Sequence, residues 1–160
     1  MSEGTKSLVG YCGLYCGACG IYQGRIRQAV ENLNKIIRAY GFDKLAPELA
    51  KWEPALKHYK EFEQVMEGLI NLFGGCPSCV GEGGNPTCEI RICCKQKGHS
   101  ICAECVNMDS CKKLSKGDWT LKALRRIKAM GTENWIKEME KKVNTGFCYL
   151  DEKKEEINKA

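Results

Sequence analysis

The chain has 160 residues, a length that suits one domain, and twelve of them are cysteines, several times the ordinary share. Its formal net charge of +5 counts every thiol as neutral. Because metal-bound thiolates would cancel most of that charge, basicity is weak evidence for a polyanionic partner. The first residues, MSEGTKSLVG, contain no apolar leader, and no apolar run is long enough to cross a membrane. We therefore expect a cytoplasmic protein without a membrane partner, in a reducing compartment where clustered thiols hold metal more often than they form disulfides.

The first half of the chain predicts two long amphipathic helices. Apolar residues recur at steps of three and four between residues 19 and 40, and Gly41 ends this pattern. A short helix fits residues 42–52. A second long helix is predicted to begin near Pro54, a residue favoured at the first helical position, and to end at Gly74. The aromatic and methionine side chains of these helices are predicted to form core rather than a cofactor site.

Residues 76–111 have a different character, with eight cysteines, many glycines and few large apolar side chains. Such a segment cannot offset the entropy cost of its own ordering by hydrophobic burial. Metal–thiolate bonds can supply the missing stability, on the order of 10 kcal/mol or more per structural site in small zinc peptides. Within the segment, a short helix is predicted over residues 89–97 and is closed by Gly98.

Two further helices are predicted after the cysteine-rich segment. Asp118 is expected to cap the first and Thr132 the second, and they end at Gly131 and Gly146. The apolar phrase at residues 147–150 is expected to pack as an extended segment. The predicted fold is therefore mainly α, a helical body of about four to six helices with an irregular cysteine-rich metal-binding insert. We expect a single domain whose parts are an N-terminal cysteine motif, a helical part, the insert, the C-terminal helices and a short segment with a solvated tail: residues 1–20, 21–75, 76–111, 112–146 and 147–160.

The N-terminal stretch YCGLYCGACG places Cys12, Cys16 and Cys19 in the spacing C-x₃-C-x₂-C. Radical-SAM enzymes hold three corners of a [4Fe–4S] cluster with this spacing. Such enzymes need a (β/α) barrel around the cluster, and this chain is too short for one and lacks the repeated strand–helix alternation. The motif therefore indicates thiolate ligands without the catalytic context of that enzyme class.

Two C-x₂-C knuckles lie farther along the chain, Cys76–Cys79 and Cys102–Cys105. This spacing suits a metal because a tight turn directs two thiolates toward one ion. A thioredoxin-type redox pair has the same spacing, but it needs a strand before the motif and a helix after it, a setting that neither knuckle has. The pairing stays open: the two knuckles could share one ion, or the three N-terminal cysteines could recruit a distant fourth ligand.

Two of the twelve cysteines are not expected to be metal ligands. Cys93 and Cys94 are adjacent, and neighbouring side chains rarely bind one tetrahedral ion together, so one of them is expected to be a spare or to serve another site. Cys148 lies in an apolar phrase and is expected to be a small buried hydrophobic residue. His99 could replace a thiolate but is more simply a loop residue facing solvent, and His58 is expected at the surface or core edge.

The motifs YCGLYCGAC, CPSC, CEIRIC and KGHSICAEC, in this order, resemble the cysteine-rich proteins grouped as domain of unknown function 3795. The resemblance extends to LKALRRIKAMGTENWI and so covers Tyr11 to Ile136. It implies metal binding and supplies no reaction, because the family is uncharacterised, and Cys94 and Cys148 are extra to its pattern. The ten cysteines that match the pattern, and that we take as candidate metal ligands, are Cys12, Cys16, Cys19, Cys76, Cys79, Cys88, Cys93, Cys102, Cys105 and Cys111.

The leading functional hypothesis is a zinc protein in which thiolate-bound zinc has a structural role and the surface contacts an unknown protein partner. An alternative is an iron–sulfur cluster protein for electron transfer or for redox or metal sensing, favoured by all-cysteine ligation and almost no histidine. A further alternative is a nucleic-acid-binding zinc module, although a solvated helix face explains the basic residues more simply. No catalytic residue can be assigned, so we expect binding rather than catalysis. The basic residues after Cys111 are Lys112, Lys113, Lys116, Lys122, Arg125, Arg126 and Lys128.

Overall fold

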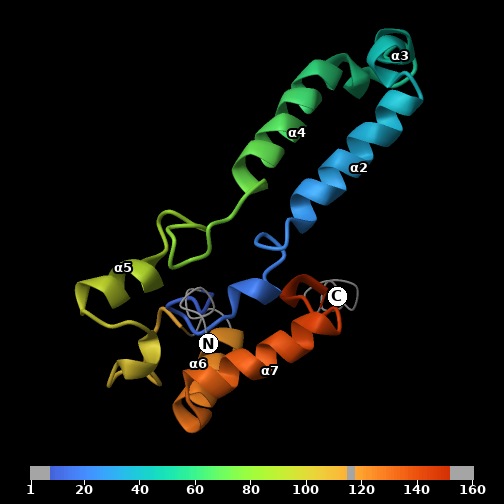
Figure 1. The fold of residues 1–160 in the computed structure, drawn as a ribbon. Coiled ribbons are helices and arrows are strands. Elements are labelled where there is room, and N and C mark those ends of the chain that lie inside the picture. Colours follow the sequence, from blue (N-terminus) through green and yellow to red (C-terminus); the bar gives the residue numbers. More distant parts are fainter. Residues whose placement is uncertain (1–7, 115–117, 152–160) are drawn as a thin grey trace. The chain divides into compact units, whose positions relative to one another are not determined.

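The computed structural model describes residues 8–114 and 118–151, and these residues are mainly helical (Figure 1). The described chain contains no β-strand, and its one isolated β-bridge joins Val9 to Tyr15. The predicted fold class, mainly α with an irregular cysteine-rich segment, is confirmed. None of the helices in the described part of the chain combines the length and the apolar composition needed to cross a bilayer.

The chain forms two compact units. Unit 1 is made from the chain up to Gln23 together with the chain from Pro77 onward, and unit 2 is the continuous segment Gly24–Cys76. Each unit has its own helices and its own buried residues, and they are described separately below.

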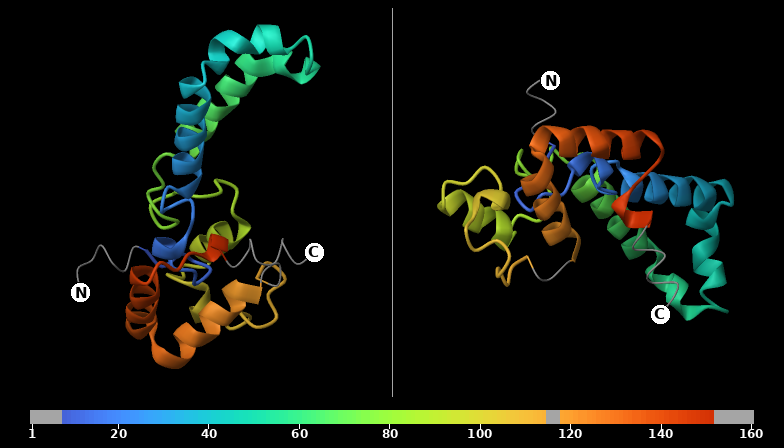
Figure 2. Two further views of the ribbon diagram at one scale, coloured as in Figure 1. Left: turned by 90° about the vertical axis from the view of Figure 1, so that its right-hand side faces the viewer. Right: turned by 90° about the horizontal axis from the view of Figure 1, so that it is seen from below.

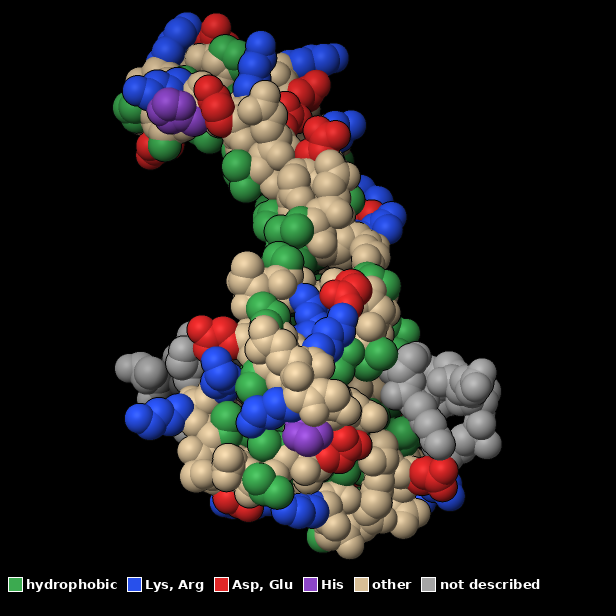
Figure 3. Space-filling model, turned by 90° about the vertical axis from the view of Figure 1, so that its left-hand side faces the viewer, with side chains coloured by type: hydrophobic (Ala, Val, Ile, Leu, Met, Phe, Trp, Pro, Cys, Tyr) green, Lys and Arg blue, Asp and Glu red, His purple; other side chains and the backbone are tan. Residues whose placement is uncertain are grey.

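Unit 2 is a helical hairpin, formed by α2 (Arg25–Ala39), α3 (Phe42–Leu49), the 3₁₀ helix η2 (Pro54–His58) and α4 (Tyr59–Phe73). Helices α2 and α4 lie side by side (Figures 1 and 2). They are antiparallel, since the guanidinium of Arg27 in the first turn of α2 donates to the carbonyl oxygen of Gly74 after α4 at 3.2 Å. Hydrophobic side chains reach the surface of this unit (Figure 3).

The helices of unit 2 lie close to where the periodicity predicts them, with shifts at their starts. The first long helix begins at Arg25 rather than near Cys19, because Gly24 adopts the left-handed conformation with φ of 68°. The second begins as the 3₁₀ turn at Pro54 before it becomes α-helical. Gly41 also has positive φ, 67°, and allows the sharp change of direction between α2 and α3 that other residues would make only under strain.

Unit 1 contains the 3₁₀ turns η1 (Cys16–Ala18) and η3 (Cys102–Glu104), the short helix α5 (Glu89–Gln96), and the helices α6 (Asp118–Met130) and α7 (Thr132–Asn144). Helices α6 and α7 pack against each other. The buried indole of Trp135 donates to the carbonyl oxygen of Gly13 at 3.1 Å, which ties α7 to the N-terminal cysteine motif. The core that joins these parts consists of Val9, Tyr15, Ala18, Ala123, Ile127, Trp135, Ile136 and Met139.

The cysteine-rich segment contributes a small apolar core of its own. Met108 and, three residues beyond the segment, Leu114 are buried against Leu124 of α6, with Cys12 and Cys111 packed around them. The expectation that this segment is poor in apolar side chains holds for its composition. Met108 nevertheless anchors the segment to α6, with Ile90 and Ile101 packed beside it, so burial contributes to its ordering, although Val106 is 93% exposed.

Two local predictions at the C-terminal end are wrong. Thr132 does not cap α7, because Gly131, with φ of 82°, occupies the cap position and no side chain bonds to the helix end. The segment 147–150 is not extended throughout: a helical turn begins at Tyr149, and the amide of Asp151 donates to the carbonyl oxygen of Cys148 at 3.0 Å. Helix α6 begins at Asp118 itself, the residue predicted to cap it; the position before it, and any capping by the side chain of Asp118, lie outside the described residues.

Candidate functional site

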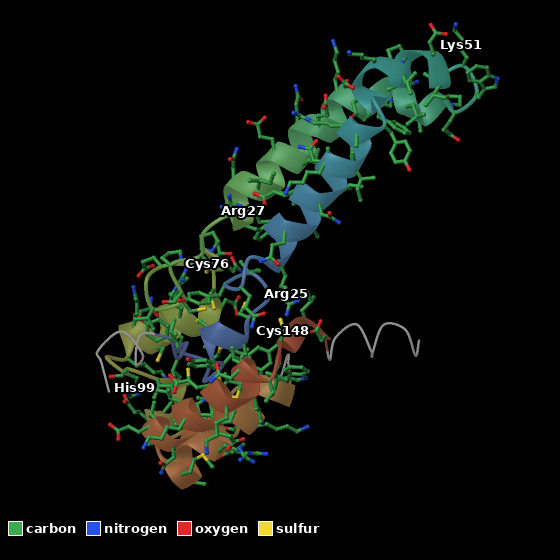
Figure 4. The ribbon with its side chains drawn as sticks, turned by 45° about the vertical axis from the view of Figure 1, so that its right-hand side comes forward. Arg25, Arg27, Lys51, Cys76, His99 and Cys148 are labelled. Atoms are coloured by element: carbon green, nitrogen blue, oxygen red, sulfur yellow. The ribbon has the colours of Figure 1, made fainter. Side chains whose placement is uncertain are left out.

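Unit 1 gathers most of the sulfur of the chain (Figure 4). All twelve cysteines are free thiols. Their mutual contacts and electrostatic effects place ten of them in two groups, and the groups adjoin at Cys12, whose charge also raises the pKa of Cys102. We call Cys12, Cys16, Cys19, Cys79 and Cys88 the first thiol group. We call Cys93, Cys94, Cys102, Cys105 and Cys111 the second thiol group.

The first thiol group is centred on a direct contact between Cys16 and Cys79, which are 63 residues apart in the sequence. The backbone N–H of Cys79 donates to Sγ of Cys16 at 3.4 Å. The two side chains also share a hydrogen bond, which lowers the pKa of Cys16 and raises the pKa of Cys79. Deprotonation of one thiol is therefore stabilised by the proton of the other.

Cys12 lies at the edge of this group. Burial, with smaller contributions from charges on Cys79 and Cys88, raises the pKa of its thiol to about 11. Thiols with raised pKa stay protonated near neutral pH, so a metal ion that binds them must displace protons.

A buried arginine organises the loop that carries Cys79 and leads to Cys88. Arg91 is 5% exposed, and its guanidinium donates to the carbonyl oxygens of Gly83 at 2.7 Å and Asn85 at 2.8 Å, with longer contacts to those of Cys79 at 3.4 Å and Pro86 at 3.3 Å. These charge-assisted bonds satisfy carbonyl groups that no regular secondary structure pairs. The guanidinium charge also helps to lower the pKa of Cys79, against the stronger raising effects of Cys16 and burial.

The second thiol group is centred on Cys94 and Cys102. Cys94 is buried, its Sγ donates to the carbonyl oxygen of His99 at 3.4 Å, and it shares a hydrogen bond with the thiol of Cys102. Burial, followed by the charge and hydrogen bond of Cys94, raises the pKa of Cys102. Cys94, which sequence spacing set aside beside Cys93, is therefore in contact with a predicted ligand.

Lys97 places a positive charge beside the same group. Its ammonium donates to Sγ of Cys105 at 3.6 Å. The charge on Cys105, that hydrogen bond and the charge on Cys93 raise the pKa of Lys97, with a smaller effect from Cys111. A cation at this position would partly offset the negative charge of a thiolate cluster.

Two C-x₂-C pairs form the same local turn. In η1 the amide of Cys19 donates to the carbonyl oxygen of Cys16 at 2.9 Å, and in η3 the amide of Cys105 donates to that of Cys102 at 3.1 Å. Each turn ends in an extended residue. The predicted knuckle turn is thus present at Cys102–Cys105, and a second one lies inside the N-terminal motif.

The structure brings together some predicted ligands and not others. It places Cys79 beside Cys16, and Cys102 beside Cys94, which favours a distant partner for the N-terminal motif over one ion shared by both knuckles. Cys76 is the last residue of unit 2, so its role as a ligand stays a prediction. Over residues 8–114 and 118–151, no three or more cysteine, histidine, aspartate or glutamate side chains converge closely enough to hold a metal ion. The donors are the soft thiols that zinc and iron–sulfur clusters use, held here as close pairs within looser groups.

The remaining candidates behave largely as expected. Cys148 is 1% exposed and packs near Gly20. His99 is half-buried in a loop, where its Nδ1 lies 3.7 Å from a carboxylate oxygen of Glu104, and His58 is exposed at the end of η2. Neither histidine joins a thiol group through its ring in the described contacts.

Several of the basic residues after Cys111 are in ion pairs. Arg125 pairs with Asp109 at 2.8 Å, and Lys113 lies 3.5 Å from Glu89. Arg126 pairs with Glu138 at 2.5 Å. Lys116 lies outside the described residues. This partial neutralisation weakens the electrostatic case for a nucleic-acid surface.

Sequence reasoning missed three residues of this region: Arg91, Cys94 and Lys97. An arginine and a lysine on a short helix look like solvated side chains, and only the fold shows that Arg91 is enclosed by a loop. The adjacency of Cys93 and Cys94 hid the fact that α5 turns them in different directions, one half-exposed and one buried. A helical wheel of α5 would have separated the two cysteines.

Comparison with known proteins gives one match. A family model described as a protein of unknown function (DUF3795) matches residues 8–116. This range includes all ten candidate ligands and Cys94, and it ends before α6, so it is shorter than the resemblance that extends to Ile136. No curated protein matches the chain, and no solved structure does.

Proposed function

Because that match spans more than half of its length, the chain belongs to the DUF3795 family of proteins of unknown function, and from this premise we propose that it binds thiophilic metal through the two thiol groups of unit 1. The leading candidate is zinc in a structural role. The observation that carries the proposal is the assembly of free thiols from distant chain segments, above all the contact between Cys16 and Cys79. Ten thiols in two groups exceed the four ligands that one tetrahedral ion needs.

The first thiol group would hold one ion, with Cys16, Cys19 and Cys79 as the central ligands and Cys12 or Cys88 as the fourth. Cys76 remains a candidate through its knuckle with Cys79. The second group would hold another ion through Cys102, Cys105, Cys111 and Cys93. A bound ion supplies a cross-link between segments that the apolar core alone joins weakly. The ions would fix the cysteine-rich segment onto α6, and the exposed surface would serve a protein partner.

An iron–sulfur cluster is the second candidate function. The supporting observation is that each group offers at least four cysteines and no histidine ring, and that Lys97 and Arg91 place positive charge beside the sulfur atoms. A cluster would give the protein a role in electron transfer or sensing, with its potential tuned by such hydrogen bonds and charges.

Metal content separates these functions directly. The protein is purified without oxygen and without added metal, and zinc, iron and visible absorbance are measured on the same sample. We expect stoichiometric zinc and no colour; stoichiometric iron with broad visible absorbance would establish the second candidate instead. Protein containing neither metal would overturn the proposal.

Paired variants test the ligand assignment. Cys16 and Cys148 are both buried cysteines of unit 1, but only Cys16 contacts another thiol of the first group. Cys16→Ala should lose about one equivalent of bound metal, whereas Cys148→Ala should keep the full amount. Equal metal content in both variants would contradict the assignment of the first thiol group.

A further inference from the structure

Unit 2 has a very small core for a separate compact unit. Its buried hydrophobic residues are Val30, Ala46, Tyr59 and Met66. A hairpin of two helices with so few buried side chains cannot reach ordinary stability from its own core. A hairpin of this size becomes stable when further helices pack against it, and an antiparallel hairpin is half of a four-helix bundle.

One face of the hairpin is polar. Val30 and Met66 mark the seam between α2 and α4, and residues on one side of this seam from both helices line a single shallow groove. The polar side chains that line it are Asn34, Arg38, Lys60, Glu63, Gln64 and Glu67. Helical geometry, with about 100° per residue, places all of these on the same rotational side of Val30 or Met66.

The opposite face is apolar. Around the axis of α2, Leu33 and Ile36 lie on one side of Val30 and Arg38 lies on the other. Around the axis of α4, Val65 and Leu72 lie on one side of Met66 and Glu67 lies on the other. Since the polar sides of both helices meet in one groove, the other sides of both helices must share the other face. We call this the apolar face, and its exposed members are Leu33, Ile36, Tyr40, Phe62, Val65 and Leu72.

The apolar face has the area that a homodimer needs. Its six side chains are between 40% (Phe62) and 73% (Tyr40) exposed. At about 200 Å² for each large side chain, they leave roughly 600 Å² of apolar surface open. A stable interface buries about 800 Å² per partner, of which about two thirds is apolar in homodimers. A patch of this size is at the upper limit of what monomeric proteins expose.

The chemistry of the face favours a second copy of the same chain. Among the described residues of α2 and α4, no charged side chain lies on this face between Leu33 and Tyr40 or between Phe62 and Leu72. A two-fold axis places a surface against itself, so a face whose centre carries no charge avoids opposing like charges there. Glu61, on the same side of α4, lies one residue beyond this stretch. Helices α2 and α4 are both 15 residues long, so each helix of one copy can pack along its full length against either helix of the other copy. We propose that the apolar face of unit 2 is a homodimer interface, in which two hairpins form an antiparallel four-helix bundle.

The oligomeric state of the full chain, as isolated and in reductant, tests this inference. Sedimentation equilibrium of the wild type should show a dimer at tens of micromolar. Val65→Glu puts a carboxylate in the centre of the apolar face and should raise the dimer dissociation constant by on the order of 100-fold or more. Gln64→Glu introduces the same side chain at the adjacent, exposed position on the polar face and should leave the dimer unchanged.

The outcomes are distinct. A wild-type protein that is monomeric at these concentrations overturns the inference, and the face then belongs to a different protein. A dimer that Val65→Glu leaves as tight as the wild type places the interface elsewhere and also overturns it. Circular dichroism of both variants shows whether the hairpin keeps its helices; if Val65→Glu loses helix, Val65→Ser, which removes apolar area without a charge, should still weaken the dimer at least about tenfold.

Discussion

The two units of this protein are ordered by different kinds of contact. Unit 2 consists of helices with a regular apolar period, and yet it leaves more large hydrophobic side chains exposed than it buries. Unit 1 contains an irregular segment with few such side chains, and single polar contacts are prominent in this unit: Arg91 inside its loop, Trp135 on the carbonyl of Gly13, and thiols on thiols. A helical repeat spreads stability over many equivalent contacts, whereas an irregular segment depends on each contact separately. Single substitutions should therefore cost more in unit 1 than in unit 2.

The largest expected effect is at Arg91. Replacement by Met keeps the volume but removes the guanidinium from the carbonyl groups of the 79–88 loop, and should lower the free energy of unfolding by about 3 kcal/mol or more. Urea unfolding followed by circular dichroism measures it. Arg27→Met is the control in unit 2, because Arg27 also donates to a backbone carbonyl but is exposed; it should cost less than about 1 kcal/mol. Equal losses would remove the contrast between the units.

Gly13 tests how closely the N-terminal motif approaches α6. Gly13 has φ of 82°, and a Cβ there would lie 2.9 Å from Cδ2 of Leu124. Gly13→Ala should cost about 2 to 3 kcal/mol, the sum of left-handed strain and a clash. Gly98→Ala has a similar φ of 67° with open space around it, and should cost about 1 kcal/mol. If both variants lose the same stability, the packing of the motif on α6 is looser than the structure indicates.

Tyr149 should make the stability of unit 1 depend on pH. Its hydroxyl oxygen accepts from the amide of Tyr15 at 3.2 Å, and burial raises the pKa of Tyr149 to about 12. Because the unfolded phenol titrates near 10, the folded state retains the proton longer, and stability should fall by about 1 kcal/mol per pH unit between about pH 10 and 12. Tyr149→Phe should cost about 1 kcal/mol at neutral pH and flatten this part of the pH profile. If the stability of the variant falls with pH as steeply as that of the wild type, groups other than Tyr149 cause the loss of stability at alkaline pH.

The smallest effect is expected in unit 2, at Tyr59. Its hydroxyl is buried and has no hydrogen-bond partner among the described residues, so burial raises the pKa of Tyr59 and the group costs desolvation energy. Tyr59→Phe should leave the protein as stable or stabilise it by up to about 1 kcal/mol. The exposed Tyr22→Phe should change stability by less than about 0.5 kcal/mol in either direction. A clear loss at Tyr59, measured by thermal unfolding, would mean that its hydroxyl has a partner.

The sequence predicted the two units unequally, for a physical reason. The helices of unit 2, and α5 to α7 of unit 1, follow from apolar period and from glycines such as Gly41 and Gly131, which are local signals. The contact between Cys16 and Cys79 depends on a fold that brings together two residues 63 positions apart, and the spacing of cysteines in the sequence could not predict this pairing. The enclosure of Arg91 also needs the tertiary path of a loop. Periodicity predicted that the aromatic and methionine side chains of the two long helices of unit 2 form core. This is correct for Tyr59 and Met66 and wrong for Tyr40 and Phe62, which are exposed, because periodicity cannot show whether another element covers a helix face.

The central claim is that metal holds the cysteine-rich segment in place, and hydrogen–deuterium exchange of the full chain in reductant tests it most directly. Exchange is compared before and after exhaustive chelation, with the peptides of residues 76–111 set against those of α2 and α4. We predict that chelation removes most of the protection of residues 76–111 and leaves that of α2 and α4 unchanged. Equal protection of residues 76–111 with and without metal would contradict the account.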